Sequence, residues 1–449
     1  MTARGAFTDL ASRISAIRPR DVPPSLHEEA KLAVLDTFAV ALAGQRSPAA
    51  QGVRRTARRT SGTGRASVWW TRHTLAIDAA AFMNAFASHV LDFDSVHYST
   101  FGHSATVILP ALFPFFDDPF LSGREILNAY IVGVEVMGVL GNAFGERLRE
   151  RGHHPTAVLG TLAASSAVGW LLRLDEVGMA RALCLSGVSL GGYTSSFGSS
   201  AKAYQVAAAA RDGLSAAVYA RDGNVSVPRG APWLDNLCRL SGADLDRLAD
   251  DTLCKPWILD QVPTAFKQYP CCAYFHQTLD ALVSMLEEGR VRAPDVRAVK
   301  LVLPSYVVGA NRFSRPRTVD EGRFSLAYNA ALAICFGRVG PEHFQSHLLE
   351  DSLVQNVMAS ITTRESEAPR SLVEIVVTLK NDSELRVTFA HRLPDRAQRS
   401  ALEKKFLGLA EGSLVEADCH AFLALLRAFE GARASDLAPF LTVEMEELA

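Results

Sequence analysis

The sequence lacks the motifs that mark several large classes of enzyme. It has no GxxxxGKS or GxxxxGKT phosphate loop and no GxGxxG segment after a predicted strand, so nucleotide binding is not indicated. No CxxC pair occurs, and the seven cysteines are odd in number and scattered along the chain. This pattern argues against a zinc site, a dithiol redox motif and a disulfide framework, and it is typical of reduced thiols.

An excess of charge of either sign is also missing. The 46 Lys and Arg residues face 48 Asp and Glu residues, for a formal net charge of -2, so we expect neither nucleic acid nor a membrane surface as a partner. Only eight of the basic residues are lysine, so a lysine in apolar surroundings stands out.

Long uninterrupted apolar runs are absent as well. The N-terminal residues lack the continuous apolar core of a signal peptide. The most apolar long run, 155–172, is interrupted by Thr and Ser and is rich in Ala and Gly, which favours a buried helix over a membrane span. We therefore expect a cytoplasmic protein.

Hydrophobic periodicity indicates two domains in this chain of 449 residues. Helical spacing dominates from residue 24 to 264, with helices expected at 32–43, 77–91, 123–144, 206–222 and 244–253. Strand-like runs at 299–303, 372–379 and 385–389, the last two flanking the polar turn 381–383, predict a sheet with a hairpin. Helices are expected between the strands at 324–336 and 348–360. We predict a mostly α fold: a large all-helical domain at 1–266, to which 395–449 returns, and a smaller α+β lid domain at 267–394.

Three short polar segments interrupt this apolar sequence. The first runs from His89 to His97 and is followed by His103, the second is 152–156, and the third runs from Lys267 to His276. Aspartate is rarely buried unless it is paired, so Asp92, between two large apolar residues, needs a partner or a function. Acid, base and cation at three distant places suggest one assembled pocket.

The side chains in these segments are suited to acid–base chemistry. His154 precedes a proline, which is favoured at the first position of a helix, and a helix entrance offers N–H groups to an anion. Imidazoles suit proton transfer near neutral pH, and the ammonium groups of Lys202 and Lys267 suit carboxylates. Plainer interpretations exist, because Asp92 could pair with an arginine and the others could be structural or solvated. Asp94 and His97 could share a metal ion, but no third ligand with familiar spacing is visible.

Taken together, the segments resemble the MmgE/PrpD family, which includes 2-methylcitrate dehydratase, cis-aconitate decarboxylase and iminodisuccinate epimerase. The resemblance covers nearly the whole chain in family order, through Leu32–Asp36, Ala43-Gly44, His89–Asp94, Gly102-His103, Gly152–Gly160, Lys202, Lys267–His276 and Phe324–Leu326. It implies a helical domain with a smaller α+β lid, a homodimer, and no need for a metal or an organic cofactor.

The resemblance also implies roles for six residues. Lys202 and Lys267 would hold carboxylates of the substrate, and His103 and His154 would move protons. Asp92 would orient or stabilise a neighbouring histidine. The sixth, His276, would complete the wall nearest the lid. Val96 stands where relatives commonly have Thr or Ser, which removes one possible contact to substrate.

The shared chemistry of the family is proton transfer at a carbon next to a carboxylate, with the resulting charge stabilised by the lysines. Our first hypothesis is a cofactor-independent lyase, a dehydratase or decarboxylase, that acts on a small di- or tricarboxylate. The second is an epimerase or isomerase of an amino- or imino-dicarboxylate that uses the same pocket. The third is a helical dimer that has kept the fold and lost turnover.

Overall fold

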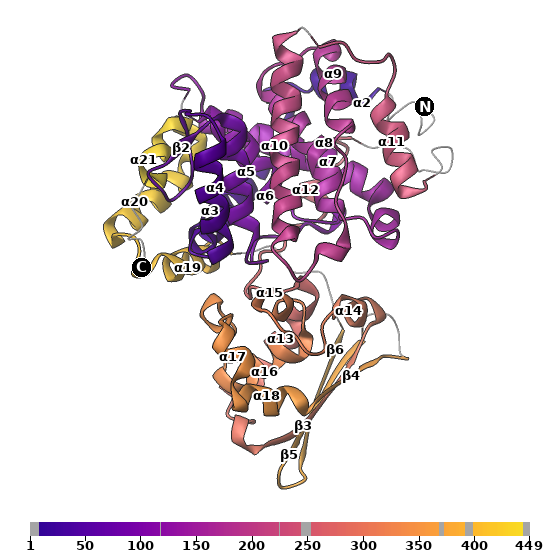
Figure 1. The fold of residues 1–449 in the computed structure, drawn as a ribbon, viewed down its shortest axis with the longest axis vertical. Helices are drawn as coiled ribbons and strands as arrows, with labels where there is room; N and C mark the ends of the chain where they lie inside the picture. Colours follow the sequence, from indigo (N-terminus) through magenta and orange to yellow (C-terminus); the bar gives the residue numbers. More distant parts are fainter. Residues whose placement is uncertain are drawn as a thin grey trace.

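The structure is a computed structural model that describes residues 9–116, 118–223, 225–243, 253–367, 372–390 and 398–442. Figure 1 shows a large body of α-helices and, below it, a smaller part in orange that holds a sheet. The predicted architecture, mostly α with a smaller α+β part, is therefore confirmed. The helix predicted at 244–253 lies outside the described residues except for its last position.

The helical part contains most of the chain from residue 10 to 261. Its α-helices are α2 (Leu10–Ala16), α3 (His27–Gln45), α4 (Pro48–Thr60), α5 (Ile77–His89), α6 (Ala105–Leu112), α7 (Gly123–Glu150), α8 (Pro155–Leu171), α9 (Glu176–Gly187), α10 (Ala201–Asp222), α11 (Pro232–Ser241) and α12 (Ile258–Gln261). A two-stranded ribbon, β1 (Ala66–Ser67) and β2 (Thr74–Leu75), lies between α4 and α5.

The central helices are buried on nearly all faces because small residues let them approach closely. A Cβ atom on Gly213 of α10 would lie 2.6 Å from the Cβ of Ala164 and 2.6 Å from the carbonyl oxygen of Thr161, both on α8. Helix α7 is long and apolar enough to cross a membrane, and 89% of its most apolar window is buried inside the protein. That burial is the pattern of a core helix.

The α+β part is a four-stranded sheet covered by helices. Strands β4 (Ile361–Glu365), β3 (Val296–Leu303), β5 (Leu372–Leu379) and β6 (Glu384–Ala390) lie in that order, with β3 and β4 parallel and the other pairs antiparallel. The predicted hairpin is present as β5 and β6. The α-helices of this part are α13 (His276–Glu287), α14 (Ser305–Ala310), α15 (Val319–Gly322), α16 (Leu326–Phe336), α17 (Ser346–Glu350) and α18 (Ser352–Ala359).

Two details of this part differ from the prediction. The helix expected at 348–360 is divided into α17 and α18 at Asp351, whose carboxylate accepts hydrogen bonds from the amides of Leu353 and Val354 and so starts a new helix. Strand β4 was not predicted, because its sequence is short and polar and all but its first residue is at least partly exposed at the sheet edge.

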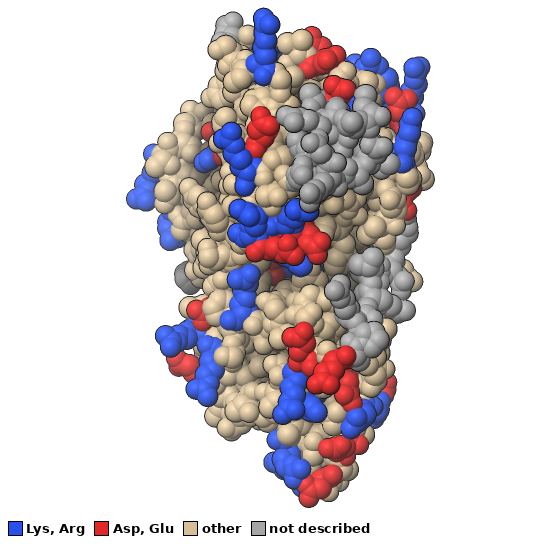
Figure 2. All heavy atoms as spheres, turned by 90° about the vertical axis from the view of Figure 1, so that its right-hand side faces the viewer, with Lys and Arg blue, Asp and Glu red and all other residues tan. Residues whose placement is uncertain are grey.

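The buried apolar side chains form two clusters. One contains the helical residues from Leu10 to Leu259 together with C-terminal residues from Leu402 to Leu441, and the other contains residues from Cys271 to Val377. The C-terminal helices α19 (Arg399–Ala410), α20 (Glu416–Arg427) and α21 (Ala438–Leu441), yellow in Figure 1, lie against the helical part. On the face drawn in Figure 2, the described Lys and Arg side chains are mixed with Asp and Glu, as the balanced composition leads one to expect.

A buried ion pair joins the C-terminal helix α19 to the segments that carry the polar residues. The ammonium of Lys405 donates to Asp36 Oδ1 at 2.7 Å and to the carbonyl oxygens of Phe93 at 3.0 Å and Lys267 at 2.9 Å. The second carboxylate oxygen of Asp36 accepts from the amide of Ser95 at 3.0 Å. Helices α3 and α19 therefore hold two of the three polar segments in place, the one from His89 to His97 and the one that begins at Lys267.

Replacing Lys405 with methionine is expected to lower the free energy of unfolding by about 3–5 kcal/mol, because the buried carboxylate of Asp36 would lose its cation. Chemical denaturation measures this loss. The exposed neighbour Lys404 provides the matched control, and Lys404→Met is expected to change stability by less than about 0.5 kcal/mol. Equal effects from both substitutions would contradict this description of the pair.

Candidate active site

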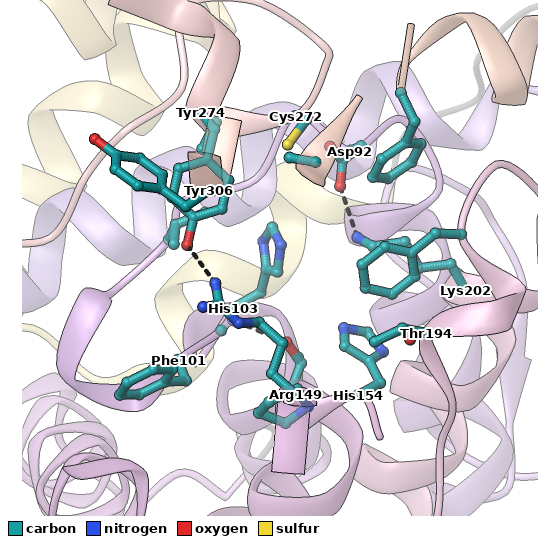
Figure 3. A pocket seen from close by; sticks show the side chains of 18 of the residues that line it. Asp92, Phe101, His103, Arg149, His154, Thr194, Lys202, Cys272, Tyr274 and Tyr306 are labelled. Atoms are coloured by element: carbon teal, nitrogen blue, oxygen red, sulfur yellow. Dashed lines mark hydrogen bonds and ion pairs between the residues drawn. The ribbon is translucent and has the colours of Figure 1, made fainter. Parts of the chain in front are cut away.

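A cavity of about 510 Å³ lies where the helical part meets the α+β part. Helical segments contribute one wall of polar side chains, and residues between 272 and 324 of the α+β part contribute tyrosines, an arginine and Phe324. Figure 3 shows these side chains pointing toward a common space. Five of the six predicted site residues line the cavity: Asp92, His103, His154, Lys202 and Lys267.

Asp92 lies between the two predicted lysines. Lys202 Nζ is 2.6 Å from Asp92 Oδ1, and Lys267 Nζ is 2.9 Å from Asp92 Oδ2 and 2.7 Å from the Asp92 carbonyl oxygen. All three side chains are buried. Burial would raise the pKa of Asp92, but the two ammonium groups outweigh it and hold that pKa well below its usual range. The cluster therefore carries a net charge of about +1, by simple addition of three ionised groups.

Each lysine keeps capacity for a ligand. An ammonium group has three N–H donors. Within the described chain, Lys202 bonds to Asp92 and to His89 Nε2 at 2.7 Å, and Lys267 makes its two bonds to Asp92. One donor of each lysine is left, and both lysines line the cavity.

Asp94 holds two imidazoles. Its Oδ2 lies 2.8 Å from His89 Nδ1 and 2.9 Å from His103 Nδ1, and the two rings are 4.6 Å apart. Burial would raise the pKa of Asp94, but the two imidazoles outweigh it and hold the carboxyl ionised. Burial lowers the pKa of His89 to about 4, and Asp94 offsets only part of that effect. His89 is therefore neutral near pH 7 and accepts a hydrogen bond from Lys202.

His103 is placed by two unusual backbone features. Asp92 follows helix α5 in the left-handed region with φ 49°, a conformation that aspartate adopts more readily than most residues. Gly102 lets the next residue approach helix α8, because a Cβ there would lie 2.3 Å from Thr156 Oγ1. That same hydroxyl accepts a hydrogen bond from the His103 amide at 3.2 Å.

His154 is the N-cap residue of α8, as the following Pro155 predicts. It is buried, and its Nδ1 lies 2.8 Å from the side-chain nitrogen of Gln205. Phe197, from the loop between α9 and α10, packs edge-on against the ring at 4.9 Å. Burial and the positive charge of Lys202 lower the pKa of His154 well below its usual value, so this imidazole is also neutral.

Two arginines stand at the exposed rim of the cavity. Arg149 of α7 donates to the hydroxyl of Tyr274 at 3.1 Å, which joins the helical part to the α+β part. The guanidinium of Arg312 lies 5.0 Å from the ring of Phe197. Among the described residues that line the cavity, four are permanent cations and one, Asp92, is a carboxylate. The lining therefore favours an anion.

Two predicted roles need correction. His276 does not line the cavity: its Nε2 is buried without a hydrogen-bond partner among the described residues, and its ring packs against Tyr269 at 5.1 Å. Cys272, four residues earlier, lines the cavity in its place. Asp92 pairs with the lysines, and the residue that orients His89 and His103 is Asp94. The charge of Asp92 does act on a neighbouring histidine, since it raises the pKa of His154 and so offsets part of the lowering by burial and Lys202.

Sequence reasoning considered Asp94 only as a metal ligand beside His97, and it assigned no role to His89 or Gln205. Asp94 and His89 lie in the predicted segment, and their five-residue separation was the available signal. Gln205 carries no such signal, because one glutamine in a helix is an ordinary surface residue. The letters GxSxG occur at 187–191, but Ser189 is exposed, follows helix α9 and does not line the cavity, so the strand-to-helix turn of a serine nucleophile is not formed there.

Asp94 and His97, considered above as a possible metal pair, do not come together, because His97 turns its Nε2 to the carbonyl oxygen of Val262 at 2.8 Å. His89, Asp94 and His103 place one ligand atom each within 4.8 Å of one another, close enough to share an ion. Their separations of 2.8 and 2.9 Å to Asp94 Oδ2 are those of charge-assisted hydrogen bonds. The ammonium of Lys202 beside His89 adds a positive charge that opposes a further cation.

The site brings together groups that are suited to acid–base chemistry, because neutral imidazoles, an ionised aspartate and two lysines meet at a cavity with cationic walls. The chain belongs to the MmgE/PrpD family. The MmgE/PrpD N-terminal domain matches residues 8–231, and the MmgE/PrpD C-terminal domain matches residues 269–430. The protein is accordingly an enzyme of the MmgE/PrpD type.

Curated relatives resemble most of the chain. The cis-aconitate decarboxylase-like protein of Aspergillus oryzae is 26% identical over 387 residues, which cover 80% of this chain and 80% of the relative. The cis-aconitate decarboxylase of Mus musculus is 24% identical over 415 residues, covering 87% and 82%. That of Aspergillus terreus is 30% identical over 226 residues, covering 49% and 46%.

Proposed function

We propose that the protein acts on a small tricarboxylate, with cis-aconitate as the first candidate, and removes carbon dioxide or water by proton transfer at a carbon next to a carboxylate. The observation that carries this proposal is His103, an imidazole held by the ionised Asp94, at a cavity whose described lining residues include four cations and one carboxylate. The names of the similar proteins support cis-aconitate over other polycarboxylates.

The chemistry of a decarboxylation uses the site as follows. The electron pair of the breaking carbon–carbon bond moves through the adjacent double bond to a carbon that takes a proton, and carbon dioxide leaves. The proton comes from Nε2 of the protonated His103, whose imidazolium is stabilised by Asp94. The remaining N–H groups of Lys202 and Lys267 stabilise the negative charge on the retained carboxylates. His103 then regains a proton from water through the open side of the cavity.

The reaction consumes one proton, which fixes the expected pH dependence. Burial lowers the pKa of His103 below its ordinary 6.5. The fraction of protonated His103 therefore falls as pH rises above that lowered pKa, and kcat/KM for decarboxylation is expected to fall with it, up to tenfold per pH unit. A profile measured from pH 5 to 9 checks this. A value of kcat/KM that rises with pH would instead indicate that neutral His103 acts as a base, as dehydration requires.

We also propose that the enzyme needs neither a metal nor an organic cofactor and works as a cytoplasmic homodimer. These proposals rest on the family resemblance and, for the location, on the scattered cysteines, which are typical of reduced thiols. Turnover after dialysis against a chelator, and light scattering of the purified protein, test the cofactor and the dimer separately.

Turnover in deuterated water, followed by proton NMR, tests the reaction itself. The substrates are cis-aconitate, citrate and 2-methylcitrate. We expect cis-aconitate to lose carbon dioxide and to give a dicarboxylate with one deuterium on carbon. Release of water from a hydroxy acid would instead identify a dehydratase. Deuterium in unchanged substrate of inverted configuration would identify the epimerase, and no reaction with any polycarboxylate would overturn the proposal.

A further inference from the structure

We infer that Gln205 holds His154 as a fixed hydrogen-bond donor, which leaves His103 as the proton carrier among the described histidines that line the cavity. This inference rests on the proposed function and deepens it. An epimerase of the two-base kind needs a proton-accepting group on each face of the substrate. A site with one group that carries a proton and one that only donates a hydrogen bond lacks the second base and is suited to a lyase.

The orientation of the Gln205 amide is set by the backbone. The amide N–H of Tyr193 donates to Gln205 Oε1 at 2.8 Å, which identifies that end of the side-chain amide as the oxygen and the other end as the nitrogen. The nitrogen Nε2 then lies 2.8 Å from His154 Nδ1, 2.7 Å from Ser196 Oγ and 3.2 Å from the Tyr193 carbonyl oxygen. An amide nitrogen only donates, so Nδ1 of His154 must accept. The proton of the neutral ring is therefore on Nε2.

His103 has the opposite arrangement. Its Nδ1 lies 2.9 Å from Asp94 Oδ2 and 3.0 Å from the carbonyl oxygen of Ser95, and both of these atoms accept. The Nδ1 atom therefore carries the proton, and Nε2 keeps a lone pair that can be loaded with a proton and unloaded. Two imidazoles in one cavity thus present different groups, a lone pair on His103 and an N–H on His154.

The groups around His154 keep its ring neutral. Four charged or titratable neighbours affect the pKa of His154, and the ammonium of Lys202 has the largest effect among them. The others are His89, His103 and Asp92. A second positive charge beside that ammonium is unfavourable, so His154 does not become an imidazolium that could release a proton. In the reaction, its Nε2–H donates a hydrogen bond to the carboxylate oxygen on which negative charge develops, and the proton stays on nitrogen.

The third histidine on the cavity wall does not supply a second carrier. His97 donates from Nε2 to the carbonyl oxygen of Val262 at 2.8 Å, and its Nδ1 is buried. Neither nitrogen of His97 is therefore open to a substrate. His89 lies behind this wall, with one nitrogen on Asp94 and the other on Lys202.

Two substitutions of Gln205 separate a tautomer effect from a packing effect. In Gln205→Glu the shape is kept, but a carboxylate oxygen replaces the amide nitrogen opposite His154 Nδ1. That oxygen draws the proton to Nδ1 and leaves a lone pair on Nε2. In Gln205→Met the donor is removed and no acceptor is added, so His154 keeps access to both tautomers. We expect kcat with cis-aconitate to fall by about 100-fold or more in Gln205→Glu, and by less in Gln205→Met.

A merely structural role for Gln205 predicts that kcat in the two variants falls in proportion to their loss of thermal stability, because glutamate also loses the hydrogen bond to the Tyr193 carbonyl oxygen. Thermal unfolding curves of both variants check this, and losses of kcat that follow the losses of stability would overturn the inference. The pH profile gives a second test, because Gln205→Glu raises the pKa of His154 and adds a decline in kcat as the Nε2 proton is lost with rising pH.

The proton position is also measured directly, without substrate, by nitrogen-15 NMR of histidine-labelled enzyme, with His154→Asn used to assign the signal. We expect the Nε2–H tautomer in the natural protein and Nδ1–H in Gln205→Glu. Nδ1–H in the natural protein would overturn the inference even if cis-aconitate is turned over. If no polycarboxylate is turned over, the proposed function fails, and the NMR result alone decides the tautomer.

Discussion

Asparagine in place of His103 is expected to reduce kcat with the proposed tricarboxylate substrate by a factor of about 10²–10⁴, the usual effect of losing a positioned acid–base group. The structure gives the reason. His103 is the imidazole whose Nδ1 is held by Asp94 and whose other nitrogen faces the cavity. Asparagine can place an amide N–H near the Nδ1 position and keep the bond to Asp94, so the loop is expected to stay folded. Steady-state kinetics and a thermal unfolding curve check both points.

The control for this substitution is His420, which is exposed on helix α20 and lies outside the cavity lining. His420→Asn is expected to leave kcat unchanged. If His103→Asn retained more than a tenth of the natural kcat with an unaltered fold, proton transfer would have to pass through another group, and the assignment of His103 would fail.

The second large effect is expected at Asp92. Its carboxylate neutralises part of the charge of two buried ammonium groups, so Asp92→Asn leaves both without an anion. Removing one partner of a buried pair costs about 3–5 kcal/mol, and the loss here is expected to reach that range. Denaturant unfolding at pH 7 measures it. Activity is expected to fall as well, because Lys202 and Lys267 would no longer be held in place.

A pH series sharpens this prediction. The pKa of Asp92 is lower in the folded protein than its ordinary 3.8, so the stability that the carboxylate contributes is fully present above that value and is lost as pH falls through the folded pKa. The natural protein is therefore expected to have a higher free energy of unfolding than Asp92→Asn at pH 7, and this difference is expected to shrink in strong acid. In the double variant Asp92→Asn/Lys202→Met, part of the stability should return because one unpaired ammonium is gone. The pairing would be contradicted if the loss of unfolding free energy in the double variant equalled the sum of the losses in the two single variants.

Much of the fold follows from local patterns. Helices α5 and α8 were predicted close to both observed limits, since apolar spacing and clear end signals such as Pro155 after His154 act within one turn. Helices α3 and α7 were also predicted, but α3 begins at His27, before the predicted residue 32, and α7 continues to Glu150, beyond the predicted residue 144. The edge strand β4 was missed because its pairing partner is about 60 residues away, and its own sequence is polar. The helix break at Asp351 depends on one capping side chain, and the sequence does not distinguish this aspartate from an ordinary polar residue within a helix.

The candidate site was predicted in part. Scarce lysines and buried acids point to Lys202, Lys267 and Asp92, because such residues are unfavourable in apolar surroundings unless they are paired. Their partners could not be assigned, since the choice between Asp92 and Asp94 as the support of His103 depends on the turn after α5, where Asp92 has positive φ. The sequence also could not decide whether His276 or Cys272 lines the cavity. Both follow Lys267, and only the direction of the chain at the start of the α+β part decides which one faces the cavity.

The most direct test of the account is a crystal structure of the natural protein with propane-1,2,3-tricarboxylate, a saturated and unreactive analogue of cis-aconitate. We predict that the ligand occupies the cavity between the helical and α+β parts, with carboxylate oxygens within hydrogen-bond distance of Lys202 or Lys267 Nζ and of His154 Nε2. Binding at another surface, with this cavity holding only solvent at saturating ligand, would contradict the account.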